Sequence, residues 1–197
     1  MKTLILVLGL VAASLMVGYF VLKQKEHKPP FALSSNTTQD LGTISDFNFL
    51  DQNGKPFGLK KLIGKTWIAD FIFTRCMGPC PVVTHEMAEL QKKFSNRPDI
   101  RFVSFSVDPE FDKPAVLSRY ASTYGADEKK WAFLTGDKKK IYELIQNHFR
   151  LAIGQESDAN FIHSLHFVWV DPEAKIKGYY NSTNPNDIEK LIQALNK

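Results

Sequence analysis

Residues 67–81 read WIADFIFTRCMGPCP, and this stretch decides the fold. Its first seven residues are apolar except for Asp70, and a short apolar run of this kind is typical of a buried strand. Two prolines then introduce a helical pattern over residues 82–94, because proline is favoured in the first turn of a helix. Cys76 and Cys80, the only cysteines of the chain, therefore stand at a strand-to-helix junction.

The rest of the chain continues this alternation of strands and helices. We expect strands at 67–73, 100–107, 131–134, 165–170 and 175–180, and helices at 82–94, 113–124, 138–149 and 185–195. Strands that alternate with helices of this length indicate a mostly parallel sheet with right-handed crossovers, and the late pair of strands adds an antiparallel edge. An Asn-Gly turn at residues 53–54 predicts a hairpin ahead of them. The sequence predicts an α/β domain of thioredoxin-like order, a central mixed sheet flanked by helices with an N-terminal hairpin.

Residues 4–22 form an uncharged apolar run that is long enough to cross a membrane. At about 1.5 Å for each helical residue the run spans roughly 28 Å, close to the thickness of a bilayer core. We expect a short tail at 1–3, a transmembrane anchor at 4–22, a linker at 23–40 and a thioredoxin-like domain at 41–197. A signal peptide cleaved after Ala13 is the alternative, but the apolar run continues nine residues past that position.

The charges around the predicted span bear on its orientation and on partners. More lysines follow the span than precede it, and the positive-inside rule alone would leave the domain in the cytoplasm. A thiol pair in an otherwise cysteine-free tethered domain is instead typical of exported proteins. We therefore expect a single-pass protein of the bacterial cytoplasmic membrane with its soluble domain on the outer, periplasmic side. The whole chain has 25 basic and 21 acidic side chains, of which residues 1–28 contribute four lysines and one glutamate. The remaining domain therefore has 21 basic and 20 acidic side chains, and this balance disfavours nucleic-acid binding.

The spacing of Cys76 and Cys80 allows two chemistries. If both lie in the first helical turn they share one face, with about 5–6 Å between their Cβ atoms, so the thiols can close a disulfide or bind one soft metal ion. Soft thiolates select Cu(I) or zinc, and the start of a helix favours the thiolate form. The plain alternative is a buried structural pair, and the neighbouring glycine and prolines argue against it because they indicate an exposed junction.

A third metal ligand must come from one of five histidines. His163 stands just before a predicted strand, where the loop of a thioredoxin-like sheet faces the cysteine junction, and it is the favoured candidate. His27 lies in the linker, while His85 and His148 fall on helical stretches and are expected to be solvated or capping residues. His166 is not expected to share a metal with His163, because residues three apart in a strand point to opposite faces.

Two further side chains near the cysteines invite a functional interpretation. Met77 carries a soft thioether, but a loosely packed loop residue is its first explanation. Asp70 lies on the apolar strand, and a buried carboxylate costs several kcal/mol unless it is paired or functional. We expect Asp70 either to pair with a lysine or to tune the thiols.

Residues 71–81 resemble the Sco/SenC family, whose members are membrane-anchored, thioredoxin-like copper proteins with a Phe-Thr-x-Cys-x-x-x-Cys-Pro motif. Residues 105–112 (FSVDPEFD) and 131–136 (WAFLTG) agree with the family in content and order. So does His163, which lies nine residues before Pro172.

This resemblance covers about residues 41–195 and implies a function. It implies that Cys76, Cys80 and His163 bind one copper ion, as Cu(I) or Cu(II). It further implies a copper chaperone that delivers the ion to the dinuclear copper site of cytochrome c oxidase subunit II during assembly. Ile162 departs from the family, where many members carry aspartate, and we expect this change to tune the site.

A membrane-tethered thiol-disulfide oxidoreductase is the rival function, with the two cysteines as a redox-active pair that reduces the oxidase subunit or other exported proteins. Asp70 and the Gly-Pro-Cys ending of the motif resemble thioredoxin and favour it. Two features oppose this function. Three residues separate the cysteines instead of two, and His163-Ser164 stands where thioredoxin enzymes place a cis-proline. A peroxidase is disfavoured because Thr74 lies two residues before Cys76 instead of three.

Overall fold

The computed structural model describes residues 41–151 and 165–196. The predicted anchor at 4–22 and linker at 23–40 lie outside these residues. Within the described ranges, the longest helices are too short or too polar to cross a membrane.

A five-stranded mixed sheet forms the centre of the described domain, in the order β5-β4-β3-β6-β7. Its strands are β3 (Thr66–Ile72), β4 (Ile100–Ser106), β5 (Trp131–Leu134), β6 (His166–Val170) and β7 (Ile176–Asn181). The strands β3, β4 and β5 run parallel, while β6 and β7 add an antiparallel edge. The predicted mixed sheet with a late antiparallel pair is therefore confirmed.

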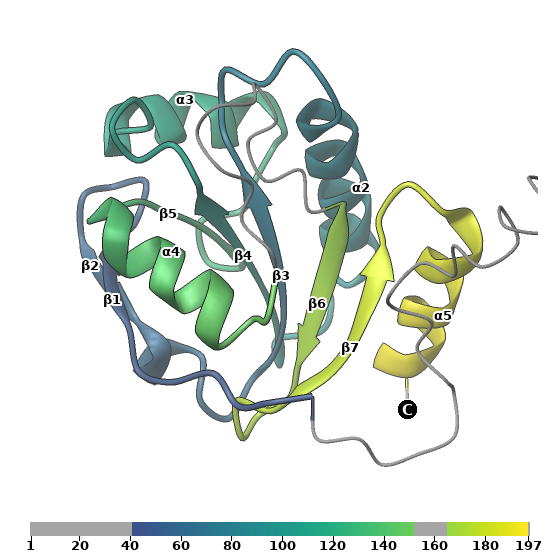
Figure 1. The fold of residues 1–197 in the computed structure, drawn as a ribbon. Coiled ribbons are helices and arrows are strands. Elements are labelled where there is room, and N and C mark those ends of the chain that lie inside the picture. The colour runs from purple at the N-terminus through teal and green to yellow at the C-terminus, as the bar shows by residue number, and fades with distance from the viewer. Residues whose placement is uncertain (1–40, 152–164, 197) are drawn as a thin grey trace, which may run out of the picture. The chain divides into compact units, whose positions relative to one another are not determined.

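Helices cover both faces of this sheet (Figure 1). They are α2 (Cys80–Lys93), α3 (Pro114–Thr123), α4 (Lys138–Asn147) and α5 (Pro185–Leu195). Side chains of α4 join a core on one face, and those of α2, α3 and α5 join a second core on the other face. Proline lies in the first turn of α2, α3 and α5, as the sequence pattern predicts.

The predicted N-terminal hairpin is present as β1 (Asn48–Leu50) and β2 (Pro56–Gly58), followed by a short 3-10 helix, η1 (Leu59–Lys61). Its turn contains Gly54, whose φ of 71° is a conformation that glycine adopts without strain. Between the strands, Gln52 is 4% exposed and its amide bonds to the edge of β5. It donates to the Trp131 carbonyl over 3.2 Å and accepts from the Phe133 amide over 2.9 Å.

Alternation along β3 divides its side chains between the two cores. Trp67, Ala69 and Phe71 face the core that includes α4, whereas Ile68 and Ile72 face the core under α2. The parallel strands β3 and β4 both end at the same edge of the sheet, and the loops that follow them meet there. Functional residues of open α/β sheets gather at this edge, and it is where both cysteines lie.

Candidate metal centre

The two cysteines lie between the end of β3 and the start of α2. Cys80 is the first residue of α2, and Cys76 lies in the preceding bend, where its amide donates to the Phe73 carbonyl over 3.2 Å. The predicted strand-to-helix junction is confirmed, although only one cysteine is helical. Both thiols are free, and the two residues are only 8% and 4% exposed, whereas Met77 and Gly78 between them are exposed. The expected exposure therefore holds for the loop of the junction and not for the cysteines themselves.

Burial also acts on the protonation of the Cys80 thiol. It raises the pKa of Cys80, and the interaction with the Cys76 thiol raises it further, whereas the Phe73 backbone acts in the opposite direction. The expectation that the helix start favours the thiolate is therefore wrong for Cys80. Pro79 and Pro81 supply no amide hydrogens to that helix start, so desolvation outweighs the helix dipole. A proton can be displaced from such a thiol by a soft cation, which binds the thiolate directly.

The structure brings together two of the three predicted ligands. His163 lies outside the described residues, and within those residues no cluster of three or more potential metal ligands is present. His85 is exposed on α2, and His148 bonds to the Ser45 hydroxyl over 2.9 Å, as expected for histidines without a metal role. Cys76 and Cys80 thus provide two sulfur donors, a set that suits a soft ion and not a hard one.

Asp70 is fully buried on the same side of β3 as Ile68 and Ile72. Within the described ranges, neither of its carboxylate oxygens accepts a hydrogen bond. Burial raises the pKa of Asp70 to about 7, while the hydroxyl of Ser104, its register neighbour on β4, acts in the opposite direction. The charge of Asp70 also contributes to the raised pKa of Cys80. The pairing with a lysine that we considered is absent from the described part of the chain, and the carboxylate is close enough to act on the Cys80 thiol.

A partly buried polar pair lies one helical turn beyond Cys80. Thr84 and Tyr120 share a hydrogen bond of 2.9 Å between their hydroxyls. Burial raises the pKa of Tyr120, and the charges of Tyr124 and Cys80 add to that rise. The sequence analysis missed both residues, because neither stands in a recognisable motif; only the position of Thr84, four residues after Cys80, signals that it shares the cysteine face of α2.

The loop after β4 contributes carboxylates to this edge that the sequence analysis did not assign. Asp112 is fully buried and accepts hydrogen bonds from Thr74, and Asp108 pairs with Arg75 over 2.6 Å. Their signal in the sequence is their place after the strand that neighbours β3, at the carboxyl edge of parallel strands.

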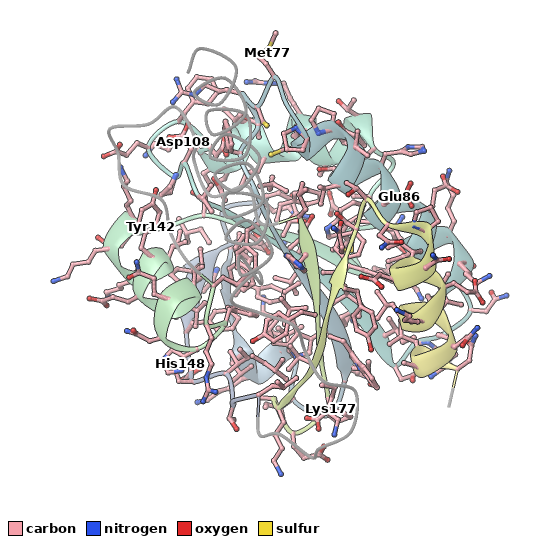
Figure 2. The ribbon with its side chains drawn as sticks, turned by 45° about the vertical axis from the view of Figure 1, so that its right-hand side comes forward. Met77, Glu86, Asp108, Tyr142, His148 and Lys177 are labelled. Carbon is pink, nitrogen blue, oxygen red and sulfur yellow. The ribbon has the colours of Figure 1, made fainter. Side chains whose placement is uncertain are left out.

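The outer rim of the site is partly apolar. Met77 is completely exposed, and Figure 2 shows it pointing into solvent at the end of the molecule where Asp108 also lies. The guanidinium of Arg75 covers the half-exposed ring of Phe111 at 4.6 Å. The expectation that Met77 is a loop residue without packing partners fits this exposure.

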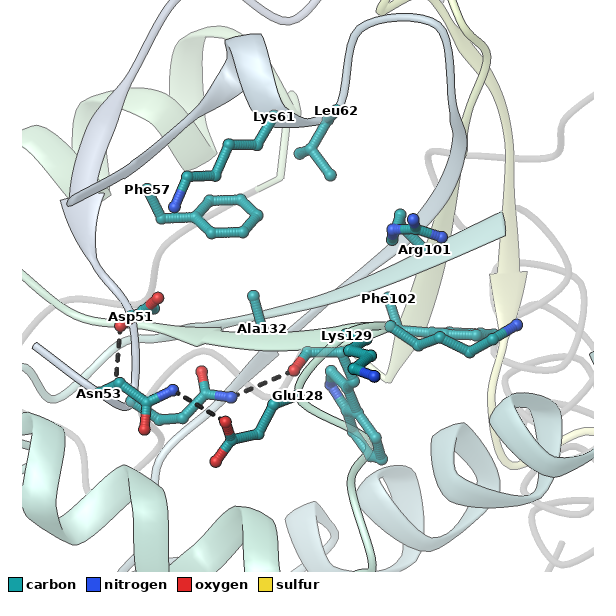
Figure 3. A pocket seen from close by; sticks show the side chains of 13 residues that line it. Asp51, Asn53, Phe57, Lys61, Leu62, Arg101, Phe102, Glu128, Lys129 and Ala132 are labelled. Carbon is teal, nitrogen blue, oxygen red and sulfur yellow. Dashed lines mark hydrogen bonds between the residues drawn. The ribbon is translucent and has the colours of Figure 1, made fainter. Parts of the chain in front are cut away.

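A cavity elsewhere in the domain is separate from the cysteines. It has a volume of about 240 Å³ and lies near the amino ends of β4 and β5, at the opposite end of the parallel strands (Figure 3). Lys61 lies over the Phe57 ring, and the Asn53 amide donates to Glu128 over 3.3 Å. Neither cysteine lines this cavity, so the cysteine edge remains the candidate site.

The sequence of this chain is similar to that of known proteins. A family model described as SCO1/SenC matches residues 35–197. The chain belongs to the SCO1/SenC family. The SCO1 protein homolog of Bacillus subtilis (strain 168) is 38% identical over 152 residues, which cover 76% of this chain and 79% of that protein.

Solved structures of family members share the fold. One of them is BsSco, described as a member of the Sco family of cytochrome c oxidase assembly proteins with a disulfide switch. It is 36% identical with a TM-score of 0.71, and the match covers 79% of this chain and 92% of that one. ScoI of Bradyrhizobium japonicum, solved with copper bound, is 25% identical with a TM-score of 0.62, covering 77% of this chain and 98% of that one. Homologous Sco structures thus hold copper on the same fold.

Proposed function

We propose that this family member is a copper chaperone whose ligands are Cys76, Cys80 and His163. The observation that carries the proposal is the pair of free, buried thiols at one edge of the sheet. Two interacting thiols in an apolar setting fit a soft monovalent ion, because Cu(I) prefers sulfur and needs little hydration. His163 completes the set in this proposal as a neutral imidazole, the other common protein ligand for copper.

We further propose that the copper is passed to subunit II of cytochrome c oxidase, at its dinuclear copper site. Support comes from the relative described as a member of the family of oxidase assembly proteins and from the copper-bound relative. A partly apolar rim with Met77 fully exposed suits a site that must be reached by another protein. The uncharged run at 4–22 supports a single-pass tether that holds the domain outside the cytoplasmic membrane.

Thiol-disulfide exchange is the second candidate function, and the buried carboxylate of Asp70 is the observation that favours it. An unpaired carboxylate with a pKa of about 7 can accept or release a proton near neutral pH. The disulfide switch described for BsSco points in the same direction. Copper binding and a Cys76–Cys80 disulfide would exclude one another, since both need the same sulfurs. Copper retained unchanged after full oxidation of both thiols would contradict this exclusion.

The test is an anaerobic titration of the reduced full chain with Cu(I), read by the ultraviolet absorption of thiolate-to-copper charge transfer. Wild type is compared with Cys76→Ser, His163→Ala and the matched control His85→Ala, which removes an exposed histidine from α2. We expect one tight equivalent in wild type and in the control, and weakened binding in the other two variants. Weak binding that is indifferent to His163 would refute the chaperone proposal and favour the oxidoreductase.

A further inference from the structure

The loop that carries Cys76 is fastened to the neighbouring strand by one buried carboxylate. Asp112 accepts a hydrogen bond from the Thr74 amide over 3.1 Å and another from the Thr74 hydroxyl over 2.5 Å. The Ser106 hydroxyl at the end of β4 donates to the same carboxylate over 2.6 Å. We call Thr74, Ser106 and Asp112 the clamp.

A second contact runs beside the clamp. Arg75 donates to Asp108 through two nitrogens, at 2.9 and 2.6 Å, and the Asp108 amide donates to the Ser106 hydroxyl over 3.1 Å. The side chain of Arg75 is 54% exposed, so solvent screens this ion pair. Asp112 is fully buried, and its hydrogen bonds are therefore the stronger hold on the loop.

Thr74 is held at two points, through its backbone and through its side chain, two residues before Cys76. Among the described residues the loop has few contacts beyond Cys76, because Met77 is fully exposed and Gly78 has no side chain. A Cβ atom at Gly78 would be 3.8 Å from the Cys76 sulfur, so the thiol lies against an exposed part of the loop. The position of the Cys76 sulfur next to Cys80 therefore depends on the fixed segment before it.

We propose that Asp112 is a positioning residue that holds the Cys76 thiol beside Cys80 by fixing Thr74. Loss of this hold leaves Cys80 in place at the start of α2 and frees Cys76 alone. The expected effect on copper affinity rests on the proposed function, since it assumes that both sulfurs bind the ion. The expected effect on the accessibility of the two thiols is independent of the proposed function.

The test compares Thr74→Val, which keeps the shape but removes the hydroxyl, with Thr74→Ser, which restores it. Thr123→Val is the matched control, because the exposed Thr123 hydroxyl donates to the Arg119 carbonyl of its own helix and lies outside the clamp. The reduced full chain is treated with iodoacetamide, and alkylation of each cysteine is followed by peptide mass spectrometry. Cu(I) affinity is measured separately by competition with a chelator.

We expect Thr74→Val to speed alkylation of Cys76 about tenfold with little change at Cys80, and to weaken Cu(I) binding about 10- to 100-fold, the usual effect of losing an outer-shell partner. Thr74→Ser and Thr123→Val should behave as wild type. Asp112→Asn should reproduce the selectivity for Cys76, and adding Thr74→Val to it should have little further effect.

The inference is overturned if Thr74→Val speeds alkylation equally at both cysteines, because that result indicates general loosening of the domain. It is also overturned if the alkylation rate of Cys76 is unchanged in Thr74→Val, or if Thr74→Ser does not restore the wild-type rate. If wild type itself fails to bind Cu(I), the proposed function is refuted, and the alkylation of Cys76 still decides the role of the clamp.

Discussion

Replacing Asp70 with asparagine is expected to stabilise the protein, and the gain should depend on pH. In the folded chain burial raises the pKa of Asp70 to about 7, whereas the unfolded chain has the ordinary value of 3.8. Between these pH values unfolding releases a proton, so the free energy of unfolding falls as pH rises and levels off above about 7. At about 1.36 kcal/mol for each pKa unit, the difference corresponds to about 4 kcal/mol at pH 8.

The neutral amide of Asp70→Asn removes this dependence. We expect the variant to be about 1 kcal/mol more stable than wild type at pH 4.5, where the carboxyl of the unfolded chain is already mostly ionised, and about 4 kcal/mol more stable at pH 8. Urea unfolding at both pH values measures the difference, with the fluorescence of the fully buried Trp67 and Trp131 as the signal. The copper-free reduced chain is used, so that metal binding does not contribute.

Asp99→Asn is the control for this experiment. Its hydrogen bond from Arg97 lowers the pKa of Asp99 to about 2, so this carboxylate contributes stability that is lost as pH falls. Because Asp99 is half-exposed, we expect a small loss of stability at pH 8 and no gain. A difference between Asp70→Asn and wild type that is the same at pH 4.5 and pH 8 would refute the assignment of a buried, unpaired carboxylate.

Two further predictions concern the hairpin and the edge of the sheet. Gln52→Leu leaves the Trp131 carbonyl and the Phe133 amide without their partner, and we expect a loss of about 1–3 kcal/mol in urea unfolding; unchanged stability would mean that water replaces the amide at no cost. Gly58→Ala places a Cβ atom 2.5 Å from the Phe47 carbonyl oxygen, a backbone atom that cannot rotate away. We expect a lower melting temperature, equivalent to about 1–3 kcal/mol, and a melting temperature equal to that of wild type would show that the hairpin shifts freely.

The order of the elements was predictable because each is encoded locally. The apolar run of β3 and the prolines at the starts of α2 and α5 are local signals, and the structure places these elements within two residues of the predicted bounds. The junction between β3 and α2 followed from the same local signals. That is why the place of Cys76 and Cys80 was predicted correctly.

The environment of the cysteines was not predictable in the same way. Glycine and proline beside a thiol usually indicate a loop in solvent, but packing against the rest of the domain buries both cysteines, and desolvation then reverses the expected direction of the Cys80 pKa. The clamp was missed for a related reason. Thr74 and Asp112 are 38 residues apart, and only the parallel pairing of β3 with β4 brings their loops together.

The amide of Gln52 has a consequence for how copies of this protein behave when crowded. Outer strands of a sheet expose backbone groups that can recruit a strand from another molecule. On β5, two of these groups are already occupied by Gln52, and Leu50 pairs with Thr135 just beyond the strand. A strand from a neighbouring molecule would find these backbone groups already paired, so the β5 edge is protected against edge-to-edge association.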